Sequence, residues 1–490
     1  STHDRKCLSC VRSGSCELQQ LCKEFGVDDE TRYEGANPHY EFDDSAAHMI
    51  RDNNKCILCR RCVAACDMQK ISVIGANARG FDTHISSAFD KDLADVSCIS
   101  CGQCIVNCPT GALVEKDDSD KVLAAINDPE KYVIVQTAPS IRATLGECFG
   151  MSIGTNVQGK MVAALRRLGF DKVFDTDFGA DLTILEEGTE LIERLTKNVG
   201  ALPMITSCSP GWIKYCETFY PEFIPNLSSC KSPHEMLGAI VKSYYAEKSG
   251  IDPKDIFVVS IMPCTAKKYE AQRDELSVDG LPDVDAVLTV RELARMIKNA
   301  GIDFKRLPDE DFDGLLGEST GAGVIFGATG GVMEAALRTV YETVTGKTLE
   351  NVNFTAVRGT EGIKEAEVDL AGRAVRVAVA HGTGNASALL DMIRSGERKY
   401  DFIEIMGCPG GCVTGGGTPF VDATTRAYID PRKERAKALY NEDASKPARK
   451  SHENAALKKL YEEYLEAPGS HRAHKLLHTS YVPRRKYTFE

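Results

Sequence analysis

The sequence predicts a large α/β domain with open sheets, preceded by a shorter cysteine-rich region of α+β type. Two observations support this prediction. From about residue 119 onward, strand-like apolar runs alternate with amphipathic helical segments, as in layered α/β folds. Before that point, cysteines recur at short fixed spacings, which is typical of cluster-binding modules. At 490 residues the chain is also too long for one ordinary core, so we expect several domains.

The composition is that of an ordinary globular protein, with 43% hydrophobic and 27% charged residues. The net charge of −12 disfavours nonspecific binding to nucleic acid. No apolar run approaches the roughly 18 residues of a membrane span, and the amino end lacks the basic-then-apolar pattern of a signal peptide. We therefore expect a cytoplasmic enzyme with protein partners.

The 19 cysteines are the unusual feature. Disulfide frameworks belong to small secreted chains, so metal ligation is the better interpretation here. His3, Cys7, Cys10 and Cys16 follow the spacing H-x3-C-x2-C-x5-C, which suits zinc or an iron–sulfur cluster equally well. We assign them to a segment over residues 1–45. Because this pattern starts so close to residue 1, we expect a further amino-terminal domain to precede it.

Two copies of the bacterial ferredoxin run C-x2-C-x2-C-x3-C follow, within a predicted two-cluster domain over residues 46–118. In such runs three thiolates bind one cubane and the fourth reaches the neighbouring cubane. One 4Fe–4S cluster then takes Cys56, Cys59, Cys62 and Cys108, and the other takes Cys66, Cys98, Cys101 and Cys104. A zinc site does not account for the second repeat and its trailing proline. Beside two such clusters, the His3 site is also better interpreted as a cluster.

The third segment, residues 119–490, carries the strand and helix patterns. Predicted strands cover residues 132–137, 202–206, 256–262, 323–327, 375–380 and 402–406. Predicted helices cover residues 157–168, 180–197, 290–299, 332–344 and 455–464, and a basic tail lying on the surface is expected to follow. An earlier helix is expected over residues 17–25, with Cys22 as a packed thiol.

Several predicted strands end in turns that contain proline or cysteine. These turns are Ala138-Pro139-Ser140, Cys208-Ser209-Pro210, Pro263-Cys264 and the loop from Cys408 to Pro419. Ligands of open α/β sheets bind beyond the carboxyl ends of strands, so we expect these turns to converge on one buried site. Thiolates suit iron–sulfur chemistry, and the glycines of the last loop would let its backbone approach a bulky inorganic group. The alternative is a glycine-rich turn with two buried thiols.

Three motifs resemble those of FeFe-hydrogenases: T-S-C-S-P-G-W at 206–212, M-P-C-T-A-K-K-Y-E at 262–270 and E-x-M-x-C-x3-C-x2-G-G-G-x-P at 404–419. The resemblance continues at 326–331 and 450–454 and covers nearly the whole chain. It implies reversible hydrogen oxidation and proton reduction at an H-cluster, between two open-sheet lobes. In that cofactor a 4Fe–4S cubane is joined through a cysteine sulfur to a di-iron unit with carbon monoxide, cyanide and azadithiolate ligands.

The resemblance also implies roles for individual residues. Cys264, Cys408 and Cys412 would ligate the cubane, with Cys412 as the bridge, and Lys267 would pair with a cyanide. A charged ligand in an apolar pocket needs such a partner, although without the motif Lys267 would be interpreted as a solvated surface residue. The residues expected to line the cofactor pocket are Ala138, Pro139, Ser140, Met262, Phe326 and Met406.

The first motif departs from the family pattern, which has two adjacent cysteines, a proton relay and then a cubane ligand. Here Cys208 takes the relay position and Ser209 the ligand position. An alkoxide should bind iron less readily than a thiolate and shift the cluster potential. Ser209 could ligate, Cys208 could shift and ligate, or Cys230 could compensate. Cys230 replaces an alanine of the family pattern and His234 a glutamine, which indicates a natural subfamily.

The proton path of the family also has counterparts here. Cys208 would pass protons through Ser228, Glu190 and Glu187 to Arg194 near the surface. The two glutamates and Arg194 are spaced i, i+3 and i+7, so they can share one helix face. The alternative is a solvated helix with one ion pair.

The expected electron route runs from the cubane through the ferredoxin-like pair to the His3 cluster. The missing amino-terminal domain would fit a 2Fe–2S module. The chain has no nucleotide-binding motif, so we expect a hetero-oligomer with ferredoxin or with a flavin subunit that uses NAD(H). Two alternatives are kept: a hydrogenase-like iron–sulfur assembly or carrier protein, and a sensory hydrogenase of low turnover. Cys148 and Cys216 are expected to be packed thiols.

Overall fold

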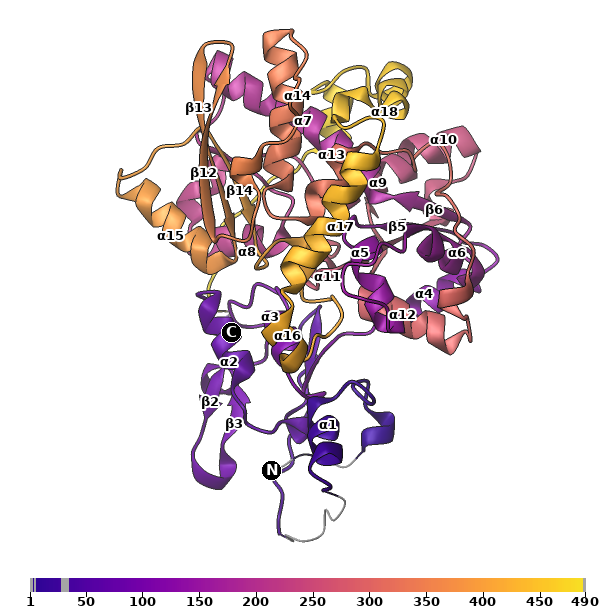
Figure 1. Ribbon diagram of the computed structural model, residues 1–490, viewed down its shortest axis with the longest axis vertical. Helices are drawn as coiled ribbons and strands as arrows, with labels where there is room; N and C mark the ends of the chain where they lie inside the picture. The colour runs from indigo at the N-terminus through magenta and orange to yellow at the C-terminus, as the bar shows by residue number, and fades with distance from the viewer. Residues whose placement is uncertain (1–2, 4–5, 28–34, 488–490) are drawn as a thin grey trace.

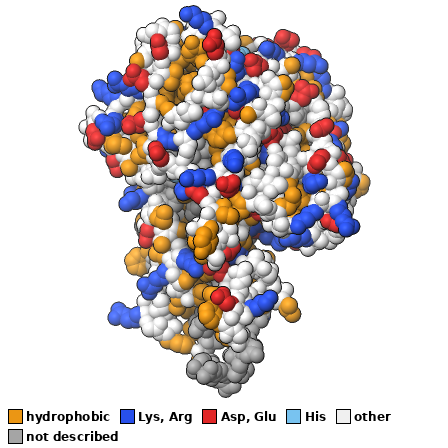
Figure 2. Space-filling view, viewed as in Figure 1, with side chains coloured by type: hydrophobic (Ala, Val, Ile, Leu, Met, Phe, Trp, Pro, Cys, Tyr) orange, Lys and Arg blue, Asp and Glu red, His pale blue; other side chains and the backbone are white. Residues whose placement is uncertain are grey.

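The computed structural model describes residue 3, residues 6–27 and residues 35–487. The cysteine-rich first 118 residues form the lower part of the molecule in Figure 1, and the α/β part lies above them. Within the described residues, no helix is long and apolar enough to cross a membrane. In the view of Figure 2, acidic and basic side chains are interspersed over the visible face.

The cysteine-rich region is α+β, as the sequence predicts. Helix α1 begins directly after Cys16. Helices α2 and α3 each follow a Cys-x2-Cys turn and one residue in the left-handed conformation, Arg60 or Gly102. Strand β1 pairs antiparallel with β4, and β2 pairs antiparallel with β3. The elements are α1 (Glu17–Glu24), β1 (Met49–Arg51), α2 (Arg61–Met68), β2 (Gly75–Asn77), β3 (His84–Ser86), α3 (Gln103–Asn107) and β4 (Leu113–Glu115).

The first sheet of the α/β part is wholly parallel, with strand order β11-β8-β5-β6. Its two central strands are almost entirely buried apolar runs, as expected for a parallel sheet covered on both faces. Helices with buried apolar faces pack against it. The elements are α4 (Ser119–Ile126), β5 (Tyr132–Thr137), α6 (Gln158–Leu168), β6 (Lys172–Asp175), α9 (Pro233–Ile240), β8 (Ile256–Met262), β11 (Ala286–Thr289) and α12 (Val290–Asn299).

The second sheet is mixed, with strand order β12-β13-β14-β7, and only β12 runs antiparallel to its neighbour. Alternate residues of β14 face opposite cores: Phe402 and Met406 join one, Ile403 and Ile405 the other. Helices α7 and α14 contribute to the first core, and α8 and α15 to the second. The elements are α7 (Thr176–Lys197), β7 (Met204–Ile205), α8 (Pro210–Phe219), α14 (Gly331–Thr345), β12 (Ile363–Leu370), β13 (Arg373–His381), α15 (Thr383–Arg394) and β14 (Phe402–Met406).

One predicted strand is wrong. Residues 323–327 form the end of a short helix, α13 (Gly321–Val324), followed by a 3-10 turn over Ile325–Gly327. The run is apolar because it packs tightly in the interior, where a Cβ on Gly323 would lie 2.5 Å from the Asp177 carbonyl oxygen. Strands β6, β11 and β12 were not predicted. Strands β6 and β11 are only four residues long, and in β12 exposed charged residues alternate with more buried ones.

The predicted long helices are confirmed within a few residues, and α12 matches at both ends. Helix 455–464 is α18 (Ala455–Leu460), extended by a π-helical turn over Tyr461–Leu465. The tail then forms α19 (His471–Leu477) and returns to the cysteine-rich region, where Tyr487 bridges Val96. The remaining short elements are α5 (Ile141–Thr144), α10 (Ala246–Ser249), α11 (Ala266–Glu270), β9 (Ser277–Val278), β10 (Leu281–Pro282) and α16 (Ala423–Tyr428).

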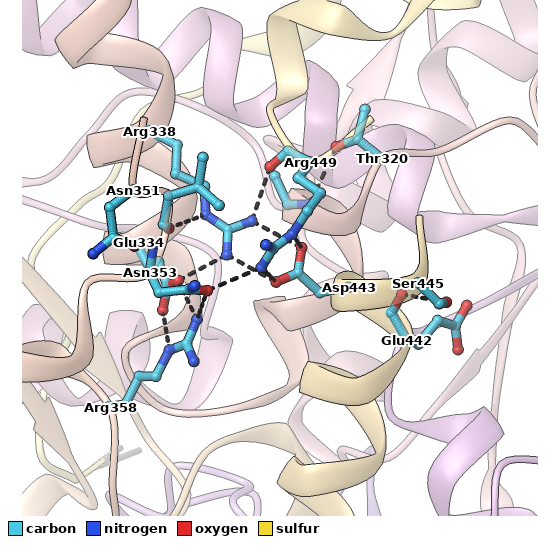
Figure 3. A network of polar contacts seen from close by, with 12 residues as sticks. Thr320, Glu334, Arg338, Asn351, Asn353, Arg358, Glu442, Asp443, Ser445 and Arg449 are labelled. Carbon is cyan, nitrogen blue, oxygen red and sulfur yellow. Dashed lines mark hydrogen bonds and ion pairs between the residues drawn. The ribbon is translucent and has the colours of Figure 1, made fainter. Parts of the chain in front are cut away.

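A buried ionic network fastens helix α17 (Pro431–Ser445) to α14 (Figure 3). Arg338 on α14 binds both oxygens of Asp443 on α17, at 2.9 and 2.8 Å, and also Glu334 at 2.7 Å. Arg449 adds a second cation to Asp443 at 2.6 Å, and Arg358 a second cation to Glu334. Arg338, Glu334 and Asp443 have fully buried side chains. The network therefore ties the carboxyl-terminal segment to the second sheet.

Removing one partner of this network should be costly, because Arg338 would stay buried without its main carboxylate. We expect Asp443→Ala to lower the free energy of unfolding by about 3–5 kcal/mol, measured by thermal or denaturant unfolding. The control is Arg376→Ala, which breaks an ion pair with Glu367 whose side chains are 62% and 59% exposed. That pair should be worth roughly 0–1 kcal/mol. Equal losses in the two variants would contradict the stabilising role of the network.

Candidate active site

The ends of four strands converge on one buried cavity of about 60 Å³, as predicted. Segments after β5, β7, β8 and β14 all contribute to its wall. The lining is mainly apolar, with one lysine, one histidine and three cysteines. The lining residues are Ala138, Pro139, Thr176, Cys208, Pro233, His234, Met262, Pro263, Cys264, Lys267, Phe326, Gly327, Met406 and Cys412.

Three predicted cubane ligands come together here. Cys264 and Cys412 line the cavity, and Cys264 also contacts the thiol of Cys408, which lowers the pKa of Cys264 to about 7. Cys264 follows β8 of the first sheet, whereas Cys408 and Cys412 follow β14 of the second. These three thiols therefore come together from two different sheets.

The glycines of the Cys408 loop allow close contact between backbones. A Cβ on Gly415 would lie 2.3 Å from the Pro263 carbonyl oxygen, and one on Gly416 would lie 2.5 Å from the Cys101 carbonyl oxygen. The Gly417 N–H donates to the Pro263 carbonyl at 2.7 Å. The loop thus packs directly against both the Cys264 turn and the ferredoxin-like domain.

Lys267 is buried rather than solvated, with its side chain 10% exposed. Its ammonium donates to Glu270 at 2.7 Å and to the Cys208 carbonyl at 3.1 Å. Burial opposes the charge, but the adjacent Glu270 carboxylate raises the pKa of Lys267 above its ordinary value. The cavity wall therefore carries a fixed positive charge.

His234 and Glu270 complete this polar corner. His234 Nε2 lies 2.6 Å from a Glu270 oxygen, and Nδ1 lies 3.1 Å from the Ser260 hydroxyl. Against the effect of burial, Lys267 and His234 lower the pKa of Glu270 to about 2. Sequence reasoning noted His234 only as a departure and assigned no role to Glu270. The sequence offered one signal for such a role: Glu270 is a charged residue at the end of the second motif.

The other pocket residues largely take their expected places. Ala138, Pro139, Met262, Phe326 and Met406 all line the cavity. Ser140 lies just behind the wall. Its buried hydroxyl has no hydrogen-bond partner in the described part of the chain.

The first-motif alternatives separate in space. Ser209 lies beside the Cys408 turn, where its hydroxyl accepts the Gly407 N–H at 3.0 Å. Cys208 lines the cavity. The Cys230 sulfur instead belongs to a cluster with Glu190 and His478, whose ligand atoms lie within 4.8 Å of one another. The structure therefore places Ser209 and Cys208, but not Cys230, next to the cysteine group.

The predicted proton-path residues form a contiguous polar chain, in a different order from that expected. Glu187 is hydrogen-bonded to Ser228, whose hydroxyl donates to Glu190 at 3.0 Å, and the Glu187 charge raises the pKa of the Cys208 thiol beyond the effect of burial. Arg194 binds the other Glu190 oxygen at 2.5 Å. Glu187, rather than Glu190, is the glutamate of this polar chain whose charge acts on Cys208, so it belongs at the Cys208 end and not at the far end.

Arg194 is buried, not near the surface as predicted, and is only 6% exposed. Its guanidinium also donates to the carbonyl oxygens of Ala201, Asn226 and Leu227. The segments that carry these carbonyls cover Arg194. Helical spacing cannot predict such contacts, because they come from another part of the chain.

The two ferredoxin runs line two separate small cavities. Cys56, Cys59, Cys62 and Cys108 surround one, and Cys66, Cys98, Cys101 and Cys104 surround the other. These are the two sets expected from crossed ligation. His48, which sequence reasoning missed, also lines the second cavity, and its Nε2 lies 3.8 Å from the Cys98 sulfur.

The second of these cavities adjoins the active site. Thr265, next to Cys264, donates to the Ser100 carbonyl at 2.8 Å, and Gln103 donates to the Thr414 carbonyl at 3.1 Å. The amino-terminal segment packs at the other cavity, where Arg12 donates to the Cys108 carbonyl and the Glu17 N–H to the Pro109 carbonyl.

The cysteines outside the ferredoxin runs and the active site differ in exposure. Cys16 is buried, Cys7 and Cys10 are half-buried, and residues 4 and 5 lie outside the described residues. Cys22 is only half-buried, less than a packed thiol should be. Cys216 is fully buried, and Cys148 is half-buried against the first core.

The family comparison fits this site. Residues 131–416, more than half of the chain, match the family described as iron only hydrogenase large subunit, C-terminal domain. The chain belongs to the iron-only hydrogenase family. This confirms the resemblance inferred from the motifs and makes the protein an enzyme, an oxidoreductase acting on hydrogen. Residues 429–484 match the iron hydrogenase small subunit, 55–121 a 4Fe-4S dicluster domain, and 1–31 the NADH-ubiquinone oxidoreductase-G iron-sulfur binding region.

Similar proteins include other hydrogenases. The NADP-reducing hydrogenase subunit HndD of Solidesulfovibrio fructosivorans is 51% identical, over 99% of this chain and 83% of its own length. Iron hydrogenase 1 of Clostridium pasteurianum is 47% identical, over 98% of this chain and 83% of its own length. The solved FeFe-hydrogenase HydA(deltaEFG) is 46% identical with a TM-score of 0.67, covering 75% of this iron-only hydrogenase and 99% of that chain. Protein NAR1 of Arabidopsis thaliana is 31% identical, over 79% of this chain and 85% of its own length.

The position of Glu187 leads to a spectroscopic prediction. Burial, followed by the nearby Glu190 charge, raises the pKa of Glu187 to about 8. The folded protein should therefore keep a proton on Glu187 at neutral pH that the unfolded chain loses, and its contribution to stability should fall as pH rises toward about 8. We expect an infrared band of a protonated carboxyl group that disappears above this pH.

Glu187→Gln should remove the band, whereas Glu193→Gln, at a partly exposed position of the same helix, should leave it in place. Because other buried carboxyl groups, such as Asp177, also have raised pKa values, the comparison is a difference spectrum. Carboxyl absorption in Glu187→Gln as strong as in the parent protein would contradict the assignment of the proton to Glu187.

Proposed function

We propose that this hydrogenase catalyses reversible hydrogen oxidation and proton reduction at an H-cluster, held where the two sheets meet. The observation that carries the proposal is the buried cavity where three thiols, a fixed cation and two methionines converge at strand ends. Cys264, Cys408 and Cys412 would ligate the cubane, with Cys412 as the bridge.

The residues present fit such a group. Thiolates are suitable ligands for iron–sulfur clusters, and the apolar lining would exclude water. The Lys267 ammonium, held by Glu270 and the Cys208 carbonyl, would offset the charge of a cyanide ligand. When bound, the H-cluster supplies the iron redox chemistry and a base that splits hydrogen heterolytically.

The chain's own contribution to proton transfer would begin at Cys208. Its thiol lines the cavity and is subject to the charge of Glu187, and it would exchange protons between the pocket and that carboxyl group. Ser228 and Glu190 continue the path with hydrogen bonds already formed. Pre-formed contacts of this kind lower the cost of general acid–base transfer.

Cys66, Cys98, Cys101 and Cys104 would hold one 4Fe–4S cluster, Cys56, Cys59, Cys62 and Cys108 a second, and the His3 site a third. These clusters would supply the one-electron transfer between the active site and a redox partner. The direct packing of the Cys408 loop on Cys101 brings the cavity for the first cluster next to the active site. The amino-terminal segment packs on the Cys108 turn, at the cavity for the second.

The electron acceptor is proposed to be ferredoxin, a flavin subunit that uses NAD(H), or both, in a cytoplasmic hetero-oligomer. Similarity to a subunit of an NADP-reducing hydrogenase supports a nicotinamide-linked partner. A 2Fe–2S module preceding residue 1 belongs to the same proposal. Purifying the native complex and finding no flavin would contradict the flavin partnership.

A role in iron–sulfur assembly is the second candidate. Ser209 in the ligand position favours it, and the mouse cytosolic iron-sulfur assembly component 3 is 29% identical over 78% of this chain. The retained Lys267, Met262 and Met406 at the cavity favour the hydrogenase. Infrared spectroscopy of matured protein decides between them: bands of bound carbon monoxide and cyanide are expected, and their absence would overturn the catalytic proposal.

Cys208→Ala should lower hydrogen turnover by about 10²–10⁴-fold, the usual contribution of a positioned acid–base group. The carbon monoxide and cyanide bands should remain, because the cysteine ligand group is untouched. The matched control is Cys216→Ala, whose buried thiol only donates to the Tyr220 carbonyl. Undiminished turnover in Cys208→Ala would contradict the relay.

Ser209 is proposed as the fourth cubane ligand, because its hydroxyl lies beside the Cys408 turn. Ser209→Cys should keep the cluster and shift its midpoint potential, since a thiolate replaces a harder, more basic oxygen. Ser209→Ala should lower the iron bound at this site. Redox titration followed by electron paramagnetic resonance measures both effects, and an unchanged cluster in Ser209→Ala would reassign the ligand to Cys208.

A further inference from the structure

The proton path of the proposed function continues beyond Glu190 toward the carboxyl-terminal helix. One Glu190 oxygen accepts from the Ser229 hydroxyl at 3.2 Å and from the Ser229 N–H at 3.0 Å. The same hydroxyl lies 2.8 Å from Nδ1 of His478, just after α19. Ser229 thus connects the carboxylate to an imidazole on a segment about 290 residues away in sequence.

His478 lies between the interior and the surface. Its Nε2 is 3.1 Å from a Glu186 oxygen, and its ring centroid is 4.1 Å from that of the exposed His474. Glu186 is buried and also accepts from Tyr461 at 2.5 Å and from the Gly469 N–H at 2.9 Å. The titratable groups that face His478 are therefore Glu186, Glu190, Cys230 and His474, and Tyr461 is linked to it through Glu186.

Arg194 is poorly suited to release protons at this point. A guanidinium stays protonated in proteins, and Arg194 already donates to Glu190 and to three backbone carbonyls while almost fully buried. Its contacts fix the position of the Glu190 carboxylate. Arg194 is thus a positioning residue, and the exit must lie elsewhere.

We propose that protons leave the relay through Ser229 and His478 and reach solvent beside His474. This inference rests on the proposed function, because it needs a relay that delivers protons to Glu190. Protonated Glu190 gives its proton to the Ser229 oxygen, while the Ser229 hydroxyl proton passes to His478 Nδ1. The imidazolium then loses its Nε2 proton, by way of the Glu186 carboxylate 3.1 Å away, to water beside His474. The neutral ring then exchanges its Nδ1 proton for one at Nε2 before it accepts the next proton.

The test uses the matured full-length chain. His478→Ala should slow hydrogen turnover about tenfold or more, with a larger solvent isotope effect, because a proton transfer becomes limiting. Free imidazole in the buffer should restore most of the rate. His478→Gln keeps hydrogen-bonding groups near Ser229 and Glu186 but cannot shuttle a proton, so it should stay slow and separates a relay from a structural role.

The matched control is His471→Ala, which removes an exposed histidine at the start of α19 and should turn over like the parent protein. An independent readout is nitrogen NMR of histidine-labelled protein without the H-cluster. Ser229→Ala should shift the Nδ1 signal of His478, because it removes the hydroxyl that lies 2.8 Å from that nitrogen.

The outcomes distinguish this inference from the proposed function. Parent-like turnover in both His478 variants, or an Nδ1 signal of His478 that Ser229→Ala leaves unchanged, would overturn the His478 exit. If Cys208→Ala also turns over normally, the whole relay fails. If the matured parent protein lacks carbon monoxide and cyanide bands, the proposed function itself fails.

Discussion

The contact between the glycine loop after β14 and the turn after β8 is the constraint on which the site depends. Two separate sheets supply the thiols, so the cysteines meet only if the two turns touch. That contact leaves no room for a Cβ on Gly415 or Gly416. It also presses the loop against Cys101, so the same packing brings the second ferredoxin cavity next to the active site. The convergence of the thiols and the closeness of the ferredoxin cavity thus share one structural cause.

The buried charges around the cavity follow a related logic. Lys267, Glu270 and His234 are costly to remove from water, and each is retained in contact with an opposite charge or a hydrogen-bond partner. An apolar packing of the same volume could be more stable, but it would offer no cation to an anionic ligand. These three residues therefore lower the stability of the fold but provide a fixed electrostatic field at the cavity. By contrast, no residue of the Arg338 network lines the cavity, and the network joins elements of the fold.

Sequence reasoning succeeds where ligand chemistry is local. The two ferredoxin runs gave cysteine sets that line two separate cavities, and long apolar runs gave β5 and β8. It failed at residues 323–327, because a tightly packed glycine-rich helix and a buried strand are both short apolar runs. It also could not place Arg194, Glu270 or His478. Their partners lie on distant segments, so their burial and hydrogen bonds arise only from the tertiary fold.

X-ray diffraction at the iron absorption edge, on crystals of the matured protein, tests the central claim most directly. The account predicts strong anomalous density in the cavity bounded by Cys264, Cys412 and Lys267, extending to Cys408 and Ser209, in addition to density in the two ferredoxin cavities. Iron in both ferredoxin cavities, but none between the two sheets, would contradict it.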